Sequence, residues 1–298
     1  MKKIILSAFA ISALTLVSCN TDFERDVNNM TVSTGKADFS KFVSVGNSLT
    51  SGFRDGALYL DGQNESFPSM IAKQMGLAGG TQTFTQPLMP NNVGGFTNLY
   101  AASGNTEFYG KLTLSPTLSP TPSAPGANLD VIGGTGKYFN NMGVPGAKSF
   151  HLVTPGYGSA ANLAAGKANP YFVRFATSAT TTVLADAAAQ KPSFYTLWIG
   201  NNDVLSYATS GGSGVDQKGN LDPSTYGSND ISDPNLVANV IKTVITSLKT
   251  ANANSKGAIA NIPYVTSIPY FTTVPATPIA GLTATQVSQL NAAYATYN

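Results

Sequence analysis

The sequence predicts an α/β fold in which a parallel sheet carries helices on both faces. Three short, mainly apolar runs, at 42–45, 193–199 and 257–262, have the composition of strands. Segments with helical character lie between them, and strands that alternate with helices form parallel sheets. Functional sites in such sheets lie where the strands end, so the loops after these runs are the candidates for chemistry.

The N-terminal residues 1–18 are organised like a bacterial lipoprotein signal peptide. Lys2 and Lys3 precede an apolar stretch, 4–17, that is too short for a membrane-spanning helix. Residues 16–19 read Leu-Val-Ser-Cys and resemble the lipobox, whose cysteine is acylated after cleavage. Cys19 is the only cysteine, so no internal disulfide can form, and we expect it to be the lipid anchor. An ordinary secretory signal is the alternative.

The residues after Cys19 indicate where in the cell the protein is located and where its folded domain begins. Asn20 replaces the aspartate that retains lipoproteins in the inner membrane of enteric-type bacteria, which favours an outer-membrane lipoprotein facing the periplasm or the surface. Residues 19–40 are polar and aperiodic, as in a flexible tether. We expect the fold to begin near Phe42 and one domain to span 41–298.

Composition excludes some classes of partner. Charged residues make up 11% of the 298 residues, and without Lys2 and Lys3 the basic and acidic residues balance. Such a chain offers no basic surface for nucleic acid, and its length permits one large domain or two small ones. We see no second core, and we expect no cofactor and no metal site.

The first half predicts one helix and one long insertion. Ser66-Phe67-Pro68 is a helix start, followed by apolar residues at helical spacing. Residues of about 79–136 are rich in Gly, Pro and Thr, and their closely spaced prolines between Leu114 and Pro125 exclude a regular helix. We interpret this segment as a surface insertion at the rim of one site; a disordered linker between two domains is the alternative.

The second half continues the alternation of strands and helices. Residues 138–147 predict a short strand and a glycine-rich loop, and 180–190 an alanine-rich helix. Asp233-Pro234 is a favourable helix start, before a broad apolar stripe that should cover the sheet. The last segment, 282–298, predicts a helix with a capping box from Thr283.

Three polar loops follow predicted strands, and they bring Ser48, Gly146 and Asn202 to one edge of the sheet. These loops resemble the sequence blocks of the SGNH (GDSL-type) hydrolases, and they occur in the same order. They are Gly46-Asn47-Ser48-Leu49, the glycine loop that contains Gly146, and Gly200-Asn201-Asn202-Asp203. The resemblance implies a three-layer, flavodoxin-like sheet. It makes Ser48 the nucleophile, and the backbone N–H groups of Ser48 and Gly146 with the amide of Asn202 the oxyanion hole.

The sequence departs from this family in three places. The interval of 98 residues from Ser48 to Gly146 is lengthened by the insertion. Asn47 stands where the family has aspartate, a position outside the catalytic triad. The Asp-x-x-His block that supplies the base and its orienting acid is absent, so no base or acid is identified in this chain. His151, the only histidine, could swing toward Ser48, but a loop histidine without catalytic role is the favoured interpretation. Asp203 more plausibly stabilises its turn than serves as the acid.

We expect this chain to be the N-terminal part of a longer hydrolase. The Asp-x-x-His block and a final strand are missing, and the last predicted helix has no residues that would end it. The leading hypothesis is an extracytoplasmic serine esterase or lipase that acts on a small-molecule, lipid or acylated-glycan ester, with this fragment nearly inactive. The alternative is a non-catalytic surface lipoprotein that binds glycan or lipid. A purely structural envelope protein with a β-rich surface is a third possibility.

Overall fold

The computed structural model describes residues 32–80, 83–96, 109–124, 130–273, 281–293 and 295. The expected signal peptide, Cys19 and the first part of the tether lie outside the described residues, as do parts of the insertion. None of the described helices is long and apolar enough to span a membrane.

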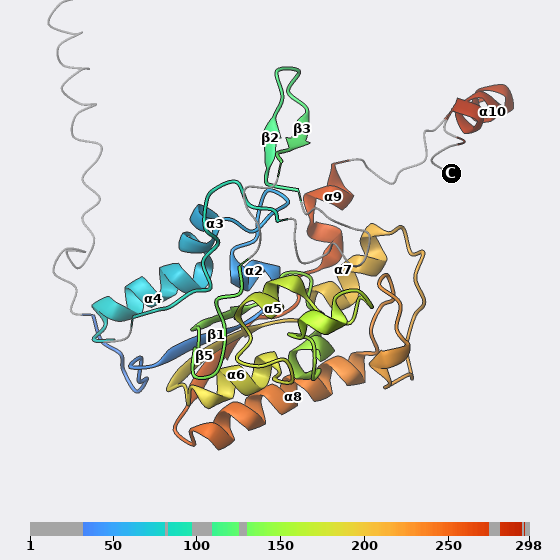
Figure 1. Cartoon of the computed structure of the whole chain (residues 1–298). Coiled ribbons are helices and arrows are strands. Elements are labelled where there is room, and N and C mark those ends of the chain that lie inside the picture. The colour runs from blue at the N-terminus through green and yellow to red at the C-terminus, as the bar shows by residue number, and fades with distance from the viewer. Residues whose placement is uncertain are drawn as a thin grey trace, which may run out of the picture.

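Four parallel strands form the central sheet, in the order β4-β1-β5-β6. They are β1 (Phe42–Gly46), β4 (Asn141–Gly143), β5 (Phe194–Trp198) and β6 (Lys256–Ile259). The predicted parallel α/β architecture is confirmed, and the strand order is compatible with a flavodoxin-like fold (Figure 1). Because β1 lies between β4 and β5, the loops that follow these three strands are neighbours at one edge.

One face of the sheet is covered by α6 (Val183–Ala189) and α8 (Pro234–Ala251), which run beneath the strands in Figure 1. The Asp233 carboxylate caps α8, because it accepts the N–H groups of Asn235 and Leu236 at 2.7 and 3.0 Å. The main core fills the space between sheet and helices, and its fully buried members include Val43, Val45, Leu197, Val183, Val244 and Leu248.

The opposite face carries α4 (Phe67–Leu77), whose first turn is capped by the side chain of Ser66, as the sequence predicts. Aromatic rings fill the space beneath it. Phe42 stacks on Phe84 with ring centroids 5.3 Å apart, and Trp198 meets Phe67 edge-on at 5.6 Å. Helices therefore lie on both faces, and the strand–helix alternation of the sequence becomes three layers (Figure 1).

The insertion is packed onto the same body where it is described. Phe96 and Met89 of the insertion are buried in a cluster with Leu58 and Tyr171, which precede and follow it in the chain. Arg174, 3% exposed, donates to the carbonyl oxygens of Pro87 and Leu88. The described parts of the insertion therefore pack against residues on either side of it in the chain. They also contain a hairpin, β2 (Leu112–Leu114) and β3 (Pro120–Pro122), that the sequence analysis did not predict.

The remaining elements are short and connect these layers. The last predicted helix is present as α10, and its capping box forms between Thr283 and Gln286. No residue of α10 is buried, and all four residues of β6 are exposed. The other helices are α2 (Ser48–Ser51), α3 (Leu60–Asn64), α5 (Pro170–Phe175), α7 (Asn201–Thr209), α9 (Pro269–Thr272) and α10 (Ala284–Ala293), with 3-10 turns η3 (Ser149–Val153), η4 (Ala160–Asn162), η5 (Pro223–Thr225) and η6 (Val265–Ser267).

Candidate functional site

Ser48 is the first residue of α2, directly after the central strand β1. Asn47 precedes it as the helix cap, with its Oδ1 accepting the N–H of Leu49 at 3.1 Å. The Nδ2 of Asn47 donates to Oδ1 of Asn201 at 3.0 Å, which ties the serine loop to the loop after β5. An aspartate could cap the helix but could not donate this second bond, so Asn47 adds a link between two loops.

Two glycines bring α2 close to the strands. Gly46 of β1 and Gly143 of β4 face each other in the sheet register. A Cβ atom on Gly143 would lie 2.3 Å from the backbone N of Ser51, and one on Gly46 2.1 Å from Oγ1 of Thr50. Any larger residue would push α2 off the sheet, so both glycines set the position of Ser48. Their packing role is not readable from sequence, because it depends on strand register.

The second loop is held against the third. Gly146 has a φ of +79°, which favours glycine, and its neighbour Pro145 accepts a hydrogen bond from Nδ2 of Asn169 at 2.8 Å. Nδ2 of Asn202 donates to the carbonyl oxygen of Ala147 at 2.9 Å. A primary amide has two N–H donors, so this bond leaves a second for a ligand. The three loops predicted to meet are therefore linked through Asn47 and Asn202.

Asp203 also links the second loop to the third, through hydrogen bonds to Ser149. It is 1% exposed, and its two carboxylate oxygens accept the backbone N–H of Ser149 at 2.7 Å and the hydroxyl of Ser149 at 2.8 Å. Burial raises the pKa of Asp203, while its bonds to Ser149 and the nearby charge of Lys148 oppose that rise. These bonds favour the turn-stabilising interpretation of Asp203 over a role as the missing acid.

His151 is occupied elsewhere. Its Nδ1 accepts the backbone N–H of Lys148 at 3.0 Å, and its ring stacks on Tyr157 with centroids 4.4 Å apart and an angle of 5° between the planes. Burial, with a smaller effect of the Lys148 charge, lowers the pKa of His151 to about 4. With Nδ1 accepting, the ring proton sits on Nε2, which leaves no nitrogen lone pair for the Ser48 hydroxyl. This arrangement favours the non-catalytic interpretation.

The sequence analysis missed the buried cation beside the site. Lys148 is 4% exposed, and its Nζ donates to the backbone oxygen of Asp230 at 2.7 Å. Burial lowers the pKa of Lys148, and the charges of Asp203 and Asp230 oppose this. The carboxylate of Asp230 in turn accepts the N–H of Val215 at 2.8 Å. Lys148 therefore connects the glycine loop with the segment before α8, and a lysine in a Gly/Ala loop was the only available signal.

The described residues offer no metal site, since no group of three His, Cys, Asp or Glu side chains lies close enough together among them. A groove of about 300 Å³ runs along α4, away from the three loops, with an apolar lining of Phe39, Met70, Ile71, Gln74, Met75 and Ala78. It contains none of the Ser48, Gly146 and Asn202 loops. The candidate chemistry therefore lies at the strand ends and not in this groove.

Comparison of the chain with protein-family models, with curated proteins and with solved structures gave no match. Function must therefore be argued from the site itself.

Proposed function

We propose that the chain carries the nucleophile and oxyanion site of an SGNH-type serine ester hydrolase. The observation that carries the proposal is the meeting of three loops around Ser48, tied by the bonds from Asn47 to Asn201 and from Asn202 to Ala147. The parallel strand order supports the finer assignment to the SGNH fold, because it places the serine loop between the other two. The substrate would be a carboxylic ester of a small molecule, a lipid or an acylated glycan.

In this proposal Ser48 Oγ attacks the ester carbonyl carbon, and the carbonyl oxygen becomes an oxyanion. The backbone N–H groups of Ser48 and Gly146 and the amide of Asn202 would stabilise that charge. Collapse of the tetrahedral intermediate breaks the bond to the leaving alkoxide and leaves an acyl-serine, which water then hydrolyses. A base must take the serine proton and deliver it to the alkoxide. His151 is not placed for this step, so the described residues alone should turn over slowly.

The cellular setting is proposed from the sequence alone. The lipobox-like run before Cys19 supports a lipidated protein of the outer membrane, held there by its acyl chains. An ester hydrolase in that position would meet substrates of the cell envelope.

Added imidazole tests the proposed site, because it can supply the missing base. We expect a fluorophosphonate probe to label the wild-type chain slowly, and imidazole to accelerate the labelling at least about tenfold. Ser48→Ala should abolish labelling, whereas Ser119→Ala, which removes an exposed hydroxyl, should leave it unchanged. Labelling would be measured by in-gel fluorescence and the modified residue by mass spectrometry.

The alternative function is a lipoprotein that uses the same loops to bind glycan or lipid without cleaving it. The sequestered ring of His151, the only histidine, favours this alternative. Equal labelling of the folded wild type and Ser48→Ala, with and without imidazole, would refute the hydrolase and leave the binding module.

A further inference from the structure

The hairpin β2–β3 projects from the body and carries exposed leucines (Figure 1). Leu112, Leu114 and Leu118 are 44%, 68% and 76% exposed. Residues 112–124 contain no charged side chain. Single exposed leucines are common on protein surfaces, but three on one uncharged projection, with Leu114 and Leu118 at its tip, form an apolar surface that water does not favour.

The pairing of the strands gathers the apolar groups on one face. Leu112 lies opposite Pro122 and Leu114 opposite Pro120, so these four side chains share a face of the hairpin. The residues between them, Thr113 and Thr121, pair on the other face, where the Thr113 hydroxyl donates to the Thr121 carbonyl at 3.3 Å. One face is therefore apolar, and the other is polar without charge.

Hydrogen bonds close the turn of the hairpin, and such bonds matter because a two-stranded ribbon alone is marginally stable. The N–H of Ser115 donates to the carbonyl of Ser119 at 3.0 Å, and the N–H of Leu118 to the carbonyl of Ser115 at 2.8 Å. Pro120 and Pro122 fix their own φ angles. Leu118 itself has a φ of +58°, a conformation that Gly or Asn adopts at lower cost. The loop holds a leucine at its tip despite this cost.

The base of the hairpin is fastened next to the candidate site. The N–H of Leu112 donates to the carbonyl of Asp55 at 2.7 Å, and that of Lys111 to Val93 at 2.8 Å. Asp55 belongs to the turn that follows α2, the helix that begins at Ser48. The hairpin is thus attached by its own backbone to the turn that follows α2.

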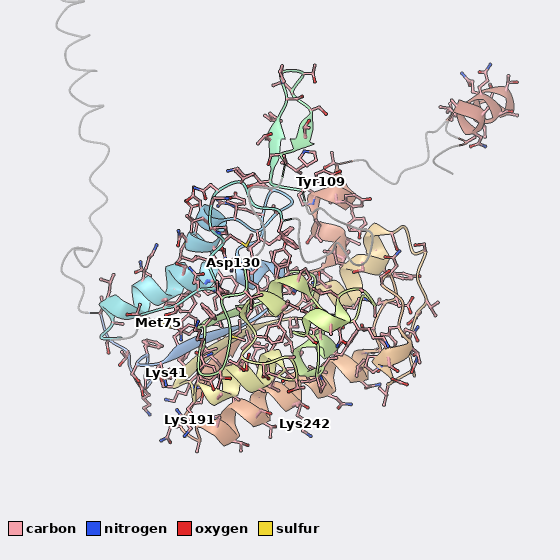
Figure 2. All side chains as sticks on the ribbon, viewed as in Figure 1. Lys41, Met75, Tyr109, Asp130, Lys191 and Lys242 are labelled. Carbon is pink, nitrogen blue, oxygen red and sulfur yellow. The ribbon has the colours of Figure 1, made fainter. Side chains whose placement is uncertain are left out.

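Exposed tyrosines lie outside the tip. Tyr109 lies at the base of the hairpin (Figure 2). Its side chain is 61% exposed. Tyr264 and Tyr270, on the segments that follow β6 and therefore at the strand-end edge, are 86% and 66% exposed. Tyrosine prefers positions where an apolar ring meets water, as at the surface of a bilayer.

We propose that the β2–β3 hairpin inserts its leucine tip into the surface of a phospholipid bilayer. The hairpin combines exposed leucines with the absence of any charged side chain over residues 112–124, as entry into hydrocarbon requires, because a charge is costly to bury there. Binding of the tip does not require Ser48. That the bilayer also supplies the ester to Ser48 is a further step, which rests on the proposed hydrolase function.

A fluorophore at the tip reports insertion directly. In the full chain with Cys19→Ser, Leu114→Cys provides a single cysteine for an environment-sensitive nitrobenzoxadiazole label. With phosphatidylcholine vesicles we expect a blue shift and quenching by lipids that carry a nitroxide on the acyl chain. The matched control is Leu77→Cys, a site on α4 that is 69% exposed and should show neither change. An unshifted, unquenched label at 114 overturns the proposal and leaves a protein partner for the tip.

A second comparison keeps the proposal separate from the hydrolase. Leu114→Ser with Leu118→Asn should weaken binding to the same vesicles roughly tenfold or more, since two leucines no longer leave water. Leu77→Ser with Leu221→Ser, two exposed leucines elsewhere, should not weaken it. With added imidazole, the hairpin variant should hydrolyse a soluble short-chain ester like the wild type but a vesicle-borne ester more slowly. Insertion without any hydrolysis would refute the hydrolase alone.

Discussion

The contacts of the His151 imidazole favour a structural role for this residue. Its ring lies against Tyr157 and its Nδ1 is bound to the backbone of Lys148. Sequence reasoning favoured a non-catalytic histidine because no Asp-x-x precedes it, but it could not foresee the stacking. The bond from Asn47 to Asn201 was equally unpredictable, since it depends on how two distant loops approach each other.

The contribution of His151 to the free energy of unfolding should fall as the pH is lowered from 6.5 toward 4, whereas the raised pKa of Asp203 acts in the opposite direction. The pKa of His151 is about 4 in the folded state, against 6.5 as its ordinary value. Between these pH values the unfolded chain binds a proton that the folded chain does not, so the free energy of unfolding decreases with falling pH by up to about 3 kcal/mol. Above pH 6.5 this residue has no such effect. Urea unfolding across this pH range measures it.

The control for this prediction is His151→Phe, which retains a ring beside Tyr157 but cannot be protonated. Its stability should be lower at pH 7, because the Lys148 N–H loses its acceptor, and the difference from the wild type should shrink toward pH 4. The pKa values of Asp230 and Asp233 are lowered by their hydrogen bonds, so their loss of stability comes below pH 3.8, outside this window. Parallel pH profiles of the two proteins would contradict the lowered pKa.

At the scale of elements, the helix starts at Ser66, Asp233 and Thr283 were predictable because capping is local. The β2–β3 hairpin was not predicted, because closely spaced prolines argue against regular structure and a pair of exposed strands lacks the apolar alternation of a buried one. The contact of α2 with the strands also escaped prediction, since it depends on the pairing of Gly46 with Gly143.

Gly143→Ala should destabilise the protein and displace Ser48. The new Cβ would lie 2.3 Å from the N of Ser51, a backbone atom that cannot move without moving α2. We expect a loss of about 1–3 kcal/mol in the free energy of unfolding, as for other overpacked sites. Imidazole-assisted labelling of Ser48 should decrease further than the folded fraction does.

Gly76→Ala is the matched substitution, because Gly76 lies in α4 and its Cβ would meet no atom within 4 Å. This variant should be as stable as the wild type or gain up to about 1 kcal/mol, since alanine favours a helix. Equal unfolding midpoints for the two variants would show that α2 does not rest on Gly143 as described.

At the scale of the whole molecule, the parallel sheet followed from the alternation of strands and helices, and the structure confirms it. The order of the strands did not follow, because alternation alone does not say on which side of β1 each strand is added. Alternation likewise does not say on which side of the sheet the expected last strand would be added. Among the described residues, β6 has β5 as its only strand neighbour.

The unpaired edge of β6 should affect the solubility of the protein. An edge strand presents unpaired backbone N–H and C=O groups to any other strand, and β6 adds Ile259, 46% exposed, beside a single charge on Lys256. The purified chain should therefore self-associate with increasing concentration, and Ile259→Lys should suppress this without lowering the unfolding midpoint. Sedimentation velocity over a range of concentrations measures both proteins. A wild type that stays monomeric at all concentrations would mean that the edge is already protected. If it self-associates, the concentration at which this protein can be handled is limited by one strand.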